Sequence, residues 1–209
     1  MNSIKYIFCL FMFIGIVSCS EKASPEYIKA LAKHRDDYKK GFAEGERAPI
    51  KTKEELDLMD FYPADESYRC MCQFVLDEQA PIIEMATYAG KKKNFMRYGT
   101  AHCEANGDKI SVGLYKNTQY ANHPIYGKKM FLPFKDYTNG EDTYGGGRYM
   151  DVPTSNIKDG QILLDFNHCY NPWCAYSDGF NCPIPPAEND LQTKLFAGEK
   201  SWKGEHKHK

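Results

Sequence analysis

The 209-residue chain has almost no net charge, because 27 basic residues nearly balance 28 acidic ones and leave a formal charge of −1. No overall positive field is available to attract a nucleic acid, so we predict no nucleic-acid partner. Internal repeats and long linkers are also absent, which predicts a single globular domain in residues 24–200. No Gly-Lys-Ser or Gly-Lys-Thr pattern follows the glycine triplet 145–147, which argues against a phosphate-binding loop.

An apolar run long enough to cross a membrane is missing as well. Residues 6–17 are almost entirely apolar and follow Lys5, but a run of about a dozen residues is too short for a transmembrane helix, which needs about 20. A basic start and a short apolar run are typical of an export signal. Residues 16–19 read Ile-Val-Ser-Cys and resemble the site at which bacterial lipoprotein signal peptidase cuts before the cysteine. We therefore predict a signal peptide in residues 1–18.

Cys19 then becomes the first residue of the mature chain and carries diacylglycerol. Two or three acyl chains attach a protein stably to a membrane, whereas one chain binds only marginally. Ser20 follows the cysteine in place of Asp, which favours the outer membrane under the enterobacterial sorting rule. We predict a lipid-anchored cell-envelope protein at the outer membrane, on its periplasmic or its surface face. Residues 19–23 form a short tether, and the predicted partners are the membrane and an unknown small ligand or envelope component.

The mature chain is expected to begin with one helix. Ser24-Pro25 is typical of a helix start, and apolar residues recur on one helical face as far as Phe42. Thr52 and Glu55 have the spacing of a capping box, which predicts a second, short helical turn.

From residue 68 the apolar period changes to two, which is typical of half-buried strands. Asn106-Gly107 predicts a hairpin, because both central residues of a type I′ turn need positive φ. No strand-helix alternation follows, so we predict a mainly β fold with an N-terminal α-helix, as a single antiparallel β-sandwich or barrel-like sheet. The expected strands number roughly seven and lie in residues 68–76, 82–88, 95–104, 109–116, 130–134, 148–152 and 162–167.

Two basic segments are interpreted as solvated. Lys91, Lys92 and Lys93 follow Gly90, and we predict a hairpin turn there in preference to a binding patch. Residues 201–209 are expected to form a basic tail in which the histidines are solvated and disordered.

Four blocks in the second half of the chain have the most distinctive sequence. They are FKDYTNGEDTYGGGRY at 134–149, DFNHCYNPWCAY at 165–176, CPIPP at 182–186 with Asn189, and AGEK at 197–200. In this order they resemble the bacterial and archaeal family called domain of unknown function 1684, in its short, lipoprotein-type form. The resemblance covers about residues 131–200 and implies a compact domain with a polar surface built from these blocks. It implies no reaction, and His168-Cys169 departs from the family pattern.

The blocks supply the candidates for ligand binding or catalysis. Their turn-forming residues can simply hydrogen-bond the local backbone. Alternatively, the glycine triplet lets backbone amides approach a ligand while Arg148 offers a planar donor fork to a carboxylate or phosphate. Asp165 is expected to pair with Arg148 or to contact a ligand. The candidates are Asp136, Thr143, Tyr144, Arg148, Asp165, Asn167, Asn171, Asn189 and Glu199.

The cysteines indicate disulfides. Of the eight, one leaves with the signal peptide and one is acylated, so six remain, and six allow 15 connectivities. An exported compartment permits such bonds. We prefer Cys174 with Cys182, because closing this irregular loop rigidifies it. Cys70 and Cys72 share one strand face and cannot readily bond each other, but either can meet Cys103.

A metal site is the alternative use of the cysteines in residues 169–182. Their spacings do not match the paired motifs of zinc sites. We therefore predict no metal ligand and no cofactor.

Residues 170–186 combine prolines with aromatic residues and predict either a core plug or one wall of a binding cleft. Aromatic faces in a cleft would suit sugars or flat ligands. Two functions follow. The preferred one is a membrane-tethered binding or structural module of the cell envelope, in which the glycine-arginine and asparagine-proline-cysteine loops form one recognition surface. The alternative is an envelope hydrolase with Asp165 or Glu199 as base and Arg148 holding an anionic group.

Overall fold

The computed structural model describes residues 22–79 and 81–208. The predicted signal peptide, Cys19 and most of the predicted tether therefore lie outside the described residues. Within the described part, no helix is long and apolar enough to cross a membrane.

The first helix, α1 (Pro25–Glu44), begins where the sequence predicts. The Ser24 hydroxyl oxygen accepts a hydrogen bond from the Tyr27 amide at 3.4 Å, which satisfies one of the free N–H groups of the first turn. Leu31 and Phe42 are buried on the inner face of α1. The short α2 (Lys53–Asp57) has the predicted capping box, formed by Thr52 and Glu55.

Eight strands of the described chain form one antiparallel sheet, so the mainly β prediction with an N-terminal helix is confirmed. The order is β6-β5-β4-β3-β1-β8-β7, and β2 pairs with β3. The expected count of seven is one short because β7 is only two residues long. The strands are β1 (Arg69–Leu76), β2 (Ile82–Ala86), β3 (Lys92–Ala105), β4 (Asp108–Asn117), β5 (Lys129–Phe134), β6 (Arg148–Pro153), β7 (Ile157–Lys158) and β8 (Gln161–Asp165).

The β3–β4 hairpin turns at the predicted pair. Asn106 has φ 49° and Gly107 has φ 89°, and Ala105 lies opposite Asp108 in the strand register. Two positive φ values in a two-residue turn match the twist of the flanking strands. This turn fixes the register of the longest hairpin in the sheet.

Two disulfides are present among the described cysteines. Cys72 in β1 bonds Cys103 in β3, with their Cα atoms 4.4 Å apart. Cys174 bonds Cys182 across the irregular loop, with Cα atoms 6.3 Å apart. Both agree with the pairings expected from the sequence, and Cys72 is the one of the two strand cysteines that meets Cys103. Cys70 and Cys169 are both buried free thiols.

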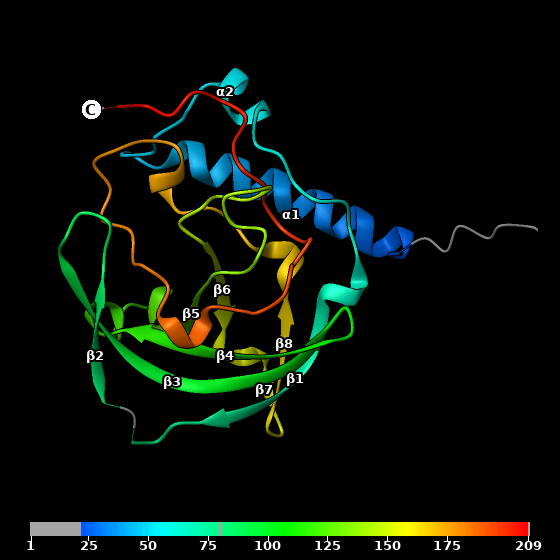
Figure 1. Ribbon diagram of the computed structural model, residues 1–209, viewed down its shortest axis with the longest axis vertical. Coiled ribbons are helices and arrows are strands. Elements are labelled where there is room, and N and C mark those ends of the chain that lie inside the picture. Colours follow the sequence, from blue (N-terminus) through cyan, green and yellow to red (C-terminus); the bar gives the residue numbers. More distant parts are fainter. Residues whose placement is uncertain (1–21, 80, 209) are drawn as a thin grey trace, which may run out of the picture.

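The main core lies between one face of the curved sheet and the coil that follows β8. Figure 1 shows β1, β3 and β4 curving through the lower half, α1 crossing the upper half, and the orange and red C-terminal segments between them. The coil is tied to the sheet where the Leu191 amide donates to the Lys135 carbonyl at 2.8 Å. Core residues from both sides include Leu114, Leu132, Phe134, Leu164, Phe166, Leu191, Leu195 and Ala197.

A second apolar cluster joins α1 to the C-terminal segment. Phe42 packs against Trp173 and Tyr176. Trp202 packs against Tyr176, and its indole N–H donates to the Glu55 carbonyl at 3.1 Å. The residues after 200 therefore return to the domain, and the expectation of a disordered end is wrong for residues 201–208.

Candidate functional site

Arg148 is a fully buried residue among the predicted site residues. Its side chain is 0% exposed, and Nη2 lies 2.6 Å from Oδ2 of Asp136, which is also fully enclosed. The guanidinium further donates to the carbonyls of Leu195, at 2.9 Å, and Ala197. Both Nη groups therefore donate to the protein itself, and Arg148 links the C-terminal coil to β6.

Asp136 completes this buried network. Its carboxylate accepts from the amide and hydroxyl of Thr138 and from the Leu195 amide. Thr143 is buried beside it, with its hydroxyl 2.8 Å from that of Thr138. These candidates build the loop between β5 and β6, as the structural interpretation of the turn residues requires.

The glycine triplet serves internal packing. Gly147 has φ 93°, and a Cβ there would lie 2.6 Å from the Phe134 carbonyl oxygen. A side chain at this position would be strained and would clash with the backbone. The glycines thus let two parts of the chain approach each other.

Two buried asparagines tie other segments together. Asn189 accepts from the Gly113 amide at 2.7 Å and donates to the carbonyls of Gly113 and Pro133. Asn167 donates to the Asp65 carbonyl at 2.9 Å. Both side chains replace the backbone partners that an irregular segment lacks.

Glu199 is a buried carboxyl group between α1 and the C-terminal coil. It accepts from the Tyr176 hydroxyl, from the Asn171 amide at 2.9 Å and from the Tyr38 hydroxyl at 3.3 Å. Burial raises the pKa of Glu199 to about 7, and the hydrogen bonds oppose that rise. Glu199 lines none of the five main cavities of the described residues, and its carboxylate is held by groups of the protein itself.

Asp165 lies beside a cavity of about 310 Å³ between α1 and the strands β6 and β8. The Tyr27 hydroxyl donates to its carboxylate at 2.7 Å, and Nε2 of His168 lies 3.8 Å from it. His168 stacks on His34 with ring centroids 3.9 Å apart. Burial lowers the pKa of both imidazoles, that of His34 to about 4.

The predicted pairing of Asp165 with Arg148 is wrong. Arg148 is held by Asp136, whereas the basic neighbour of Asp165 is Arg69, whose Nε lies 3.9 Å away. The sequence places both residues at strand ends but does not show which ends meet. The single recognition surface expected from these loops is therefore divided between the interior and separate cavities.

A larger cavity than the one beside Asp165 lies over the loop that the second disulfide closes. It encloses about 620 Å³, and an adjoining cavity of about 290 Å³ shares five of its wall residues. We call the two together the aromatic groove. Its aromatic walls are Phe95, Tyr120, Tyr126, Phe131, Tyr149, Tyr170, Trp173 and Phe180.

The charge in the aromatic groove is mainly positive. Arg47, Lys91, Lys93 and Lys129 line it, and Asp151 is the acidic wall residue. Lys129 pairs with Asp151 at 3.6 Å. Within the described chain, the Lys93 ammonium has no carboxylate at ion-pair distance, and burial lowers its pKa. The lysine run follows the turn between β2 and β3, as the sequence predicts, and Lys91 and Lys93 also line the groove.

Asn171 is the predicted candidate that reaches the aromatic groove. Its side chain is fully buried in the wall, where its Nδ2 donates to the Lys200 carbonyl at 2.8 Å. Its Oδ1 accepts no hydrogen bond from any described residue. Buried acceptors without a donor are rare in proteins, and an ordered water commonly supplies the missing hydrogen bond.

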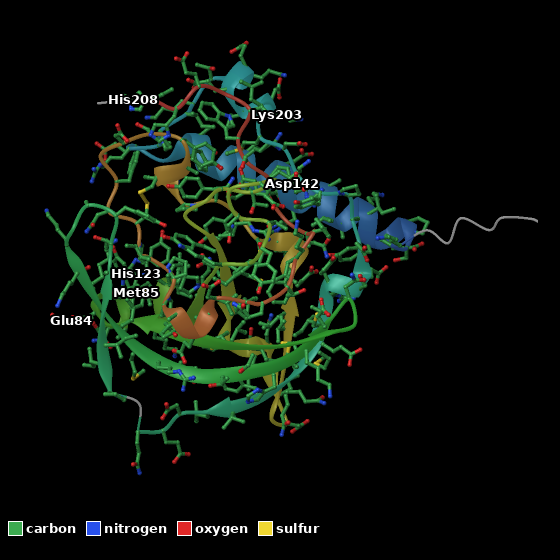
Figure 2. The ribbon with its side chains drawn as sticks, in the orientation of Figure 1. Glu84, Met85, His123, Asp142, Lys203 and His208 are labelled. Atoms are coloured by element: carbon green, nitrogen blue, oxygen red, sulfur yellow. A yellow bond between two sulfur atoms is a disulfide. The ribbon has the colours of Figure 1, made fainter. Side chains whose placement is uncertain are left out.

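The sequence revealed one wall of this groove and missed the others. Residues 170–186 were expected to form a core plug or a cleft wall; several residues from 170 to 183 line the groove, and Tyr176 lies in the second apolar cluster. Tyr120, Tyr126 and Phe131 come from distant segments whose approach depends on the sheet topology. Figure 2 shows how densely side chains fill the space between the sheet and the segments above it.

Known proteins share this architecture. A family model described as "Protein of unknown function (DUF1684)" matches residues 54–200. The solution NMR structure of an uncharacterized protein from gene locus rrnAC0354 of Haloarcula marismortui is similar, with a TM-score of 0.66 and 30% identity. That match covers 86% of this chain and 97% of the other. No curated protein matches. The family match takes in α2, the whole sheet and the coil with its buried network, so the chain belongs to the DUF1684 family of proteins of unknown function.

Proposed function

We propose that this protein is a lipid-anchored binding module of the cell envelope whose aromatic groove binds an acidic saccharide. The observation that carries the proposal is the combination of aromatic rings with the unpaired Lys93 cation in one groove. Export and lipidation rest on the sequence of residues 1–19.

The aromatic walls suit the apolar faces of sugar rings. Trp173 and Phe180 meet edge to face with centroids 5.2 Å apart, and Tyr149 and Tyr170 do so at 6.0 Å. Such rings are held rigidly by their neighbours, so a ligand loses little of its binding energy to ordering them. The C–H faces of a sugar gain dispersion contact against them.

The basic residues suit the carboxylates of an acidic sugar. Lys93 is half-buried and has no carboxylate at ion-pair distance among the described residues, so a ligand carboxylate would supply a partner through a charge-assisted hydrogen bond.

Isothermal titration of the purified protein with oligogalacturonate, and with neutral oligogalactan for comparison, tests this function. We expect saturable binding of the acidic oligomer, weakened about tenfold by Lys93→Ala, since a charge-assisted hydrogen bond contributes about 1.5–3 kcal/mol. Lys92→Ala is the matched control, because Lys92 pairs with Glu84 of β2 and neither residue lines the groove. Equal losses in both variants, or no binding of either oligomer, would contradict the proposal.

Hydrolysis at the Asp165 cavity is the second candidate function. It is favoured by the convergence of a carboxylate, a tyrosine hydroxyl and two imidazoles on one cavity. Asp165→Asn should abolish turnover of a responsive ester, phosphate or glycoside and leave oligogalacturonate affinity unchanged. Turnover that survives Asp165→Asn removes this candidate.

A further inference from the structure

The C-terminal segment places two histidines on one side of an extended backbone. Lys207 pairs with the chain at Ser177 in a parallel bridge, and its carbonyl accepts from the Asp178 amide at 2.9 Å. In an extended chain, residues two apart project to the same side. His206 and His208 therefore both face Asp178, which this pairing brings alongside them.

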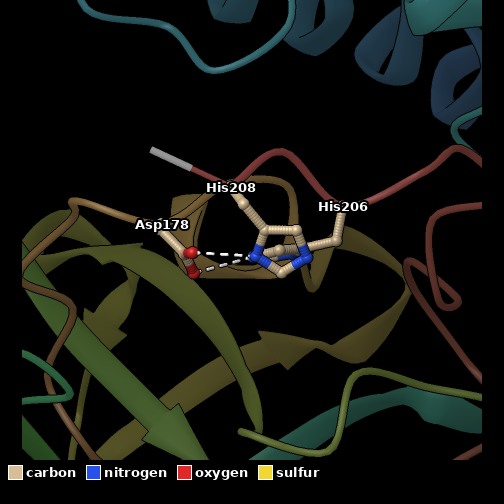
Figure 3. A group of neighbouring side chains, drawn as sticks. All are labelled: Asp178, His206 and His208. Atoms are coloured by element: carbon tan, nitrogen blue, oxygen red, sulfur yellow. Dashed lines mark hydrogen bonds and ion pairs between the residues drawn. The ribbon is translucent and has the colours of Figure 1, made fainter.

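The three side chains converge closely (Figure 3). Nε2 of His206 lies 3.0 Å from Oδ1 of Asp178, and Nδ1 of His208 lies 3.0 Å from Oδ2. One atom from each residue can be chosen so that all three lie within 4.8 Å of one another. Donor atoms at such separations can share a single ion with bonds of about 2.0–2.2 Å.

The chemistry of the three groups restricts what can lie between them. Each carboxylate oxygen faces a ring nitrogen, so a cation must separate the two lone pairs, either a proton on each ring or one shared metal ion. Two imidazoles and one carboxylate form a nitrogen-and-oxygen donor set that suits zinc and other divalent first-row metals.

The surrounding backbone orients one of the ligands. Nδ1 of His206 lies 3.4 Å from the Ala175 carbonyl oxygen, which can only accept a hydrogen bond. In the tautomer with the proton on Nδ1, that nitrogen donates to the carbonyl and the lone pair of Nε2 is directed at Asp178. Histidines that bind metals usually have such a second partner, which fixes the tautomer and the ring orientation.

We propose that Asp178, His206 and His208 form a binding site for a zinc-like divalent metal ion, which the sequence alone did not predict. Asp178 and His206 also line a cavity of about 340 Å³ that includes Tyr144, a predicted site residue. Three protein ligands leave a coordination position for water or an anion in that cavity. The cavity shares Gly179 and Phe180 with the aromatic groove, but the metal site does not depend on the groove's ligand.

Zinc titration of the purified, chelator-treated protein, with metal analysis after dialysis, tests the site. We expect one ion per chain, weaker binding in acidic than in neutral buffer, and a rise in unfolding temperature on adding zinc. His206→Ala, His208→Ala and Asp178→Asn should each weaken zinc binding by at least about tenfold. Replacing a residue that only hydrogen-bonds a metal ligand already costs about that much, and these three residues are the ligands themselves.

His102→Ala is the matched control, because His102 is an exposed histidine on β3, and it should bind zinc like the unaltered protein. Unfolding temperatures measured without metal confirm that each variant is folded. The proposal is overturned if the unaltered protein shows no saturable binding, or if all three cluster variants bind zinc as tightly as the unaltered protein. The three side chains would then form only a histidine–aspartate interaction.

Discussion

Arg148 and Asp136 form an ion pair, 2.6 Å between Nη2 and Oδ2, with no exposed surface on either side chain. Because the same guanidinium holds two carbonyls of the C-terminal coil, this pair links the sheet to the segment that closes the core. The most distinctive part of the sequence, the glycine-arginine block, is thus explained by assembly of the fold.

Removing one charge of this pair should destabilise the fold strongly. We expect Arg148→Met to lower the free energy of unfolding by about 3–5 kcal/mol, because Asp136 then remains buried without its counterion. Urea unfolding followed by circular dichroism measures the loss. The double variant Arg148→Met with Asp136→Asn should recover part of the stability. If Arg148→Met unfolds like the unaltered protein and instead loses ligand binding, the structural role is wrong.

Glu199 should make stability decline as pH rises. Its folded-state pKa is about 7, against an ordinary value of 4.5, because burial penalises the carboxylate. The stabilisation is therefore fully present below pH 4.5 and is lost as pH rises to about 7. A shift of this size corresponds to about 3 kcal/mol.

The matched comparison for this titration is Glu199→Gln, which cannot ionise and keeps one of the two acceptor oxygens. Urea unfolding at about pH 5 and about pH 8 should show the unaltered protein losing stability relative to the variant. Parallel pH profiles for the two proteins would show that Glu199 does not titrate in this range.

Lipidation at Cys19 should be visible by mass. We expect protein extracted from bacterial membranes to begin at Cys19 and to carry a diacylglycerol adduct there, since the preceding residues read as a signal peptide. Cys19→Ala should release the protein from the membrane fraction. An unmodified Cys19, or unchanged fractionation of the variant, would exclude the lipid anchor.

The Cys174–Cys182 bond should support ligand binding. Cys182 lines the aromatic groove beside Trp173, within the loop that the bond closes. Replacing both cysteines by Ser should weaken oligogalacturonate binding, because the loop must then be ordered by the ligand. Replacing Cys72 and Cys103 by Ser is the control, which should lower stability by about 2–4 kcal/mol and leave affinity unchanged. Equal oligogalacturonate affinities in the two double variants would show that the Cys174–Cys182 bond does not support ligand binding.

Local patterns predicted the elements of this fold, because each has a short-range cause. Ser24 and Pro25 start α1, Thr52 and Glu55 cap α2, and Asn106-Gly107 turns the hairpin. The two-residue β7 was missed because it is too short to show alternation.

The site residues were harder to predict because their partners are far apart in the chain. Asp136 precedes Arg148 by 12 residues and pairs with it in the structure, but charge alone made Asp165 an equally plausible partner. Lys93 was interpreted as a turn residue because its aromatic neighbours, such as Trp173, come from distant loops. Residue type identified the charged and polar side chains that could bind a ligand, but only the topology showed which of them face a cavity.

The fluorescence of Trp173 tests the groove most directly. The chain has two tryptophans, and Trp202 lies in the second apolar cluster outside the groove walls. In the Trp202→Phe variant, Trp173 is the remaining tryptophan, and its emission should change saturably with oligogalacturonate at the affinity found by calorimetry. The Trp173→Phe variant, which retains Trp202, should show no such change. Emission from Trp173 that stays constant while calorimetry detects binding would place the ligand elsewhere and contradict the groove as the binding site.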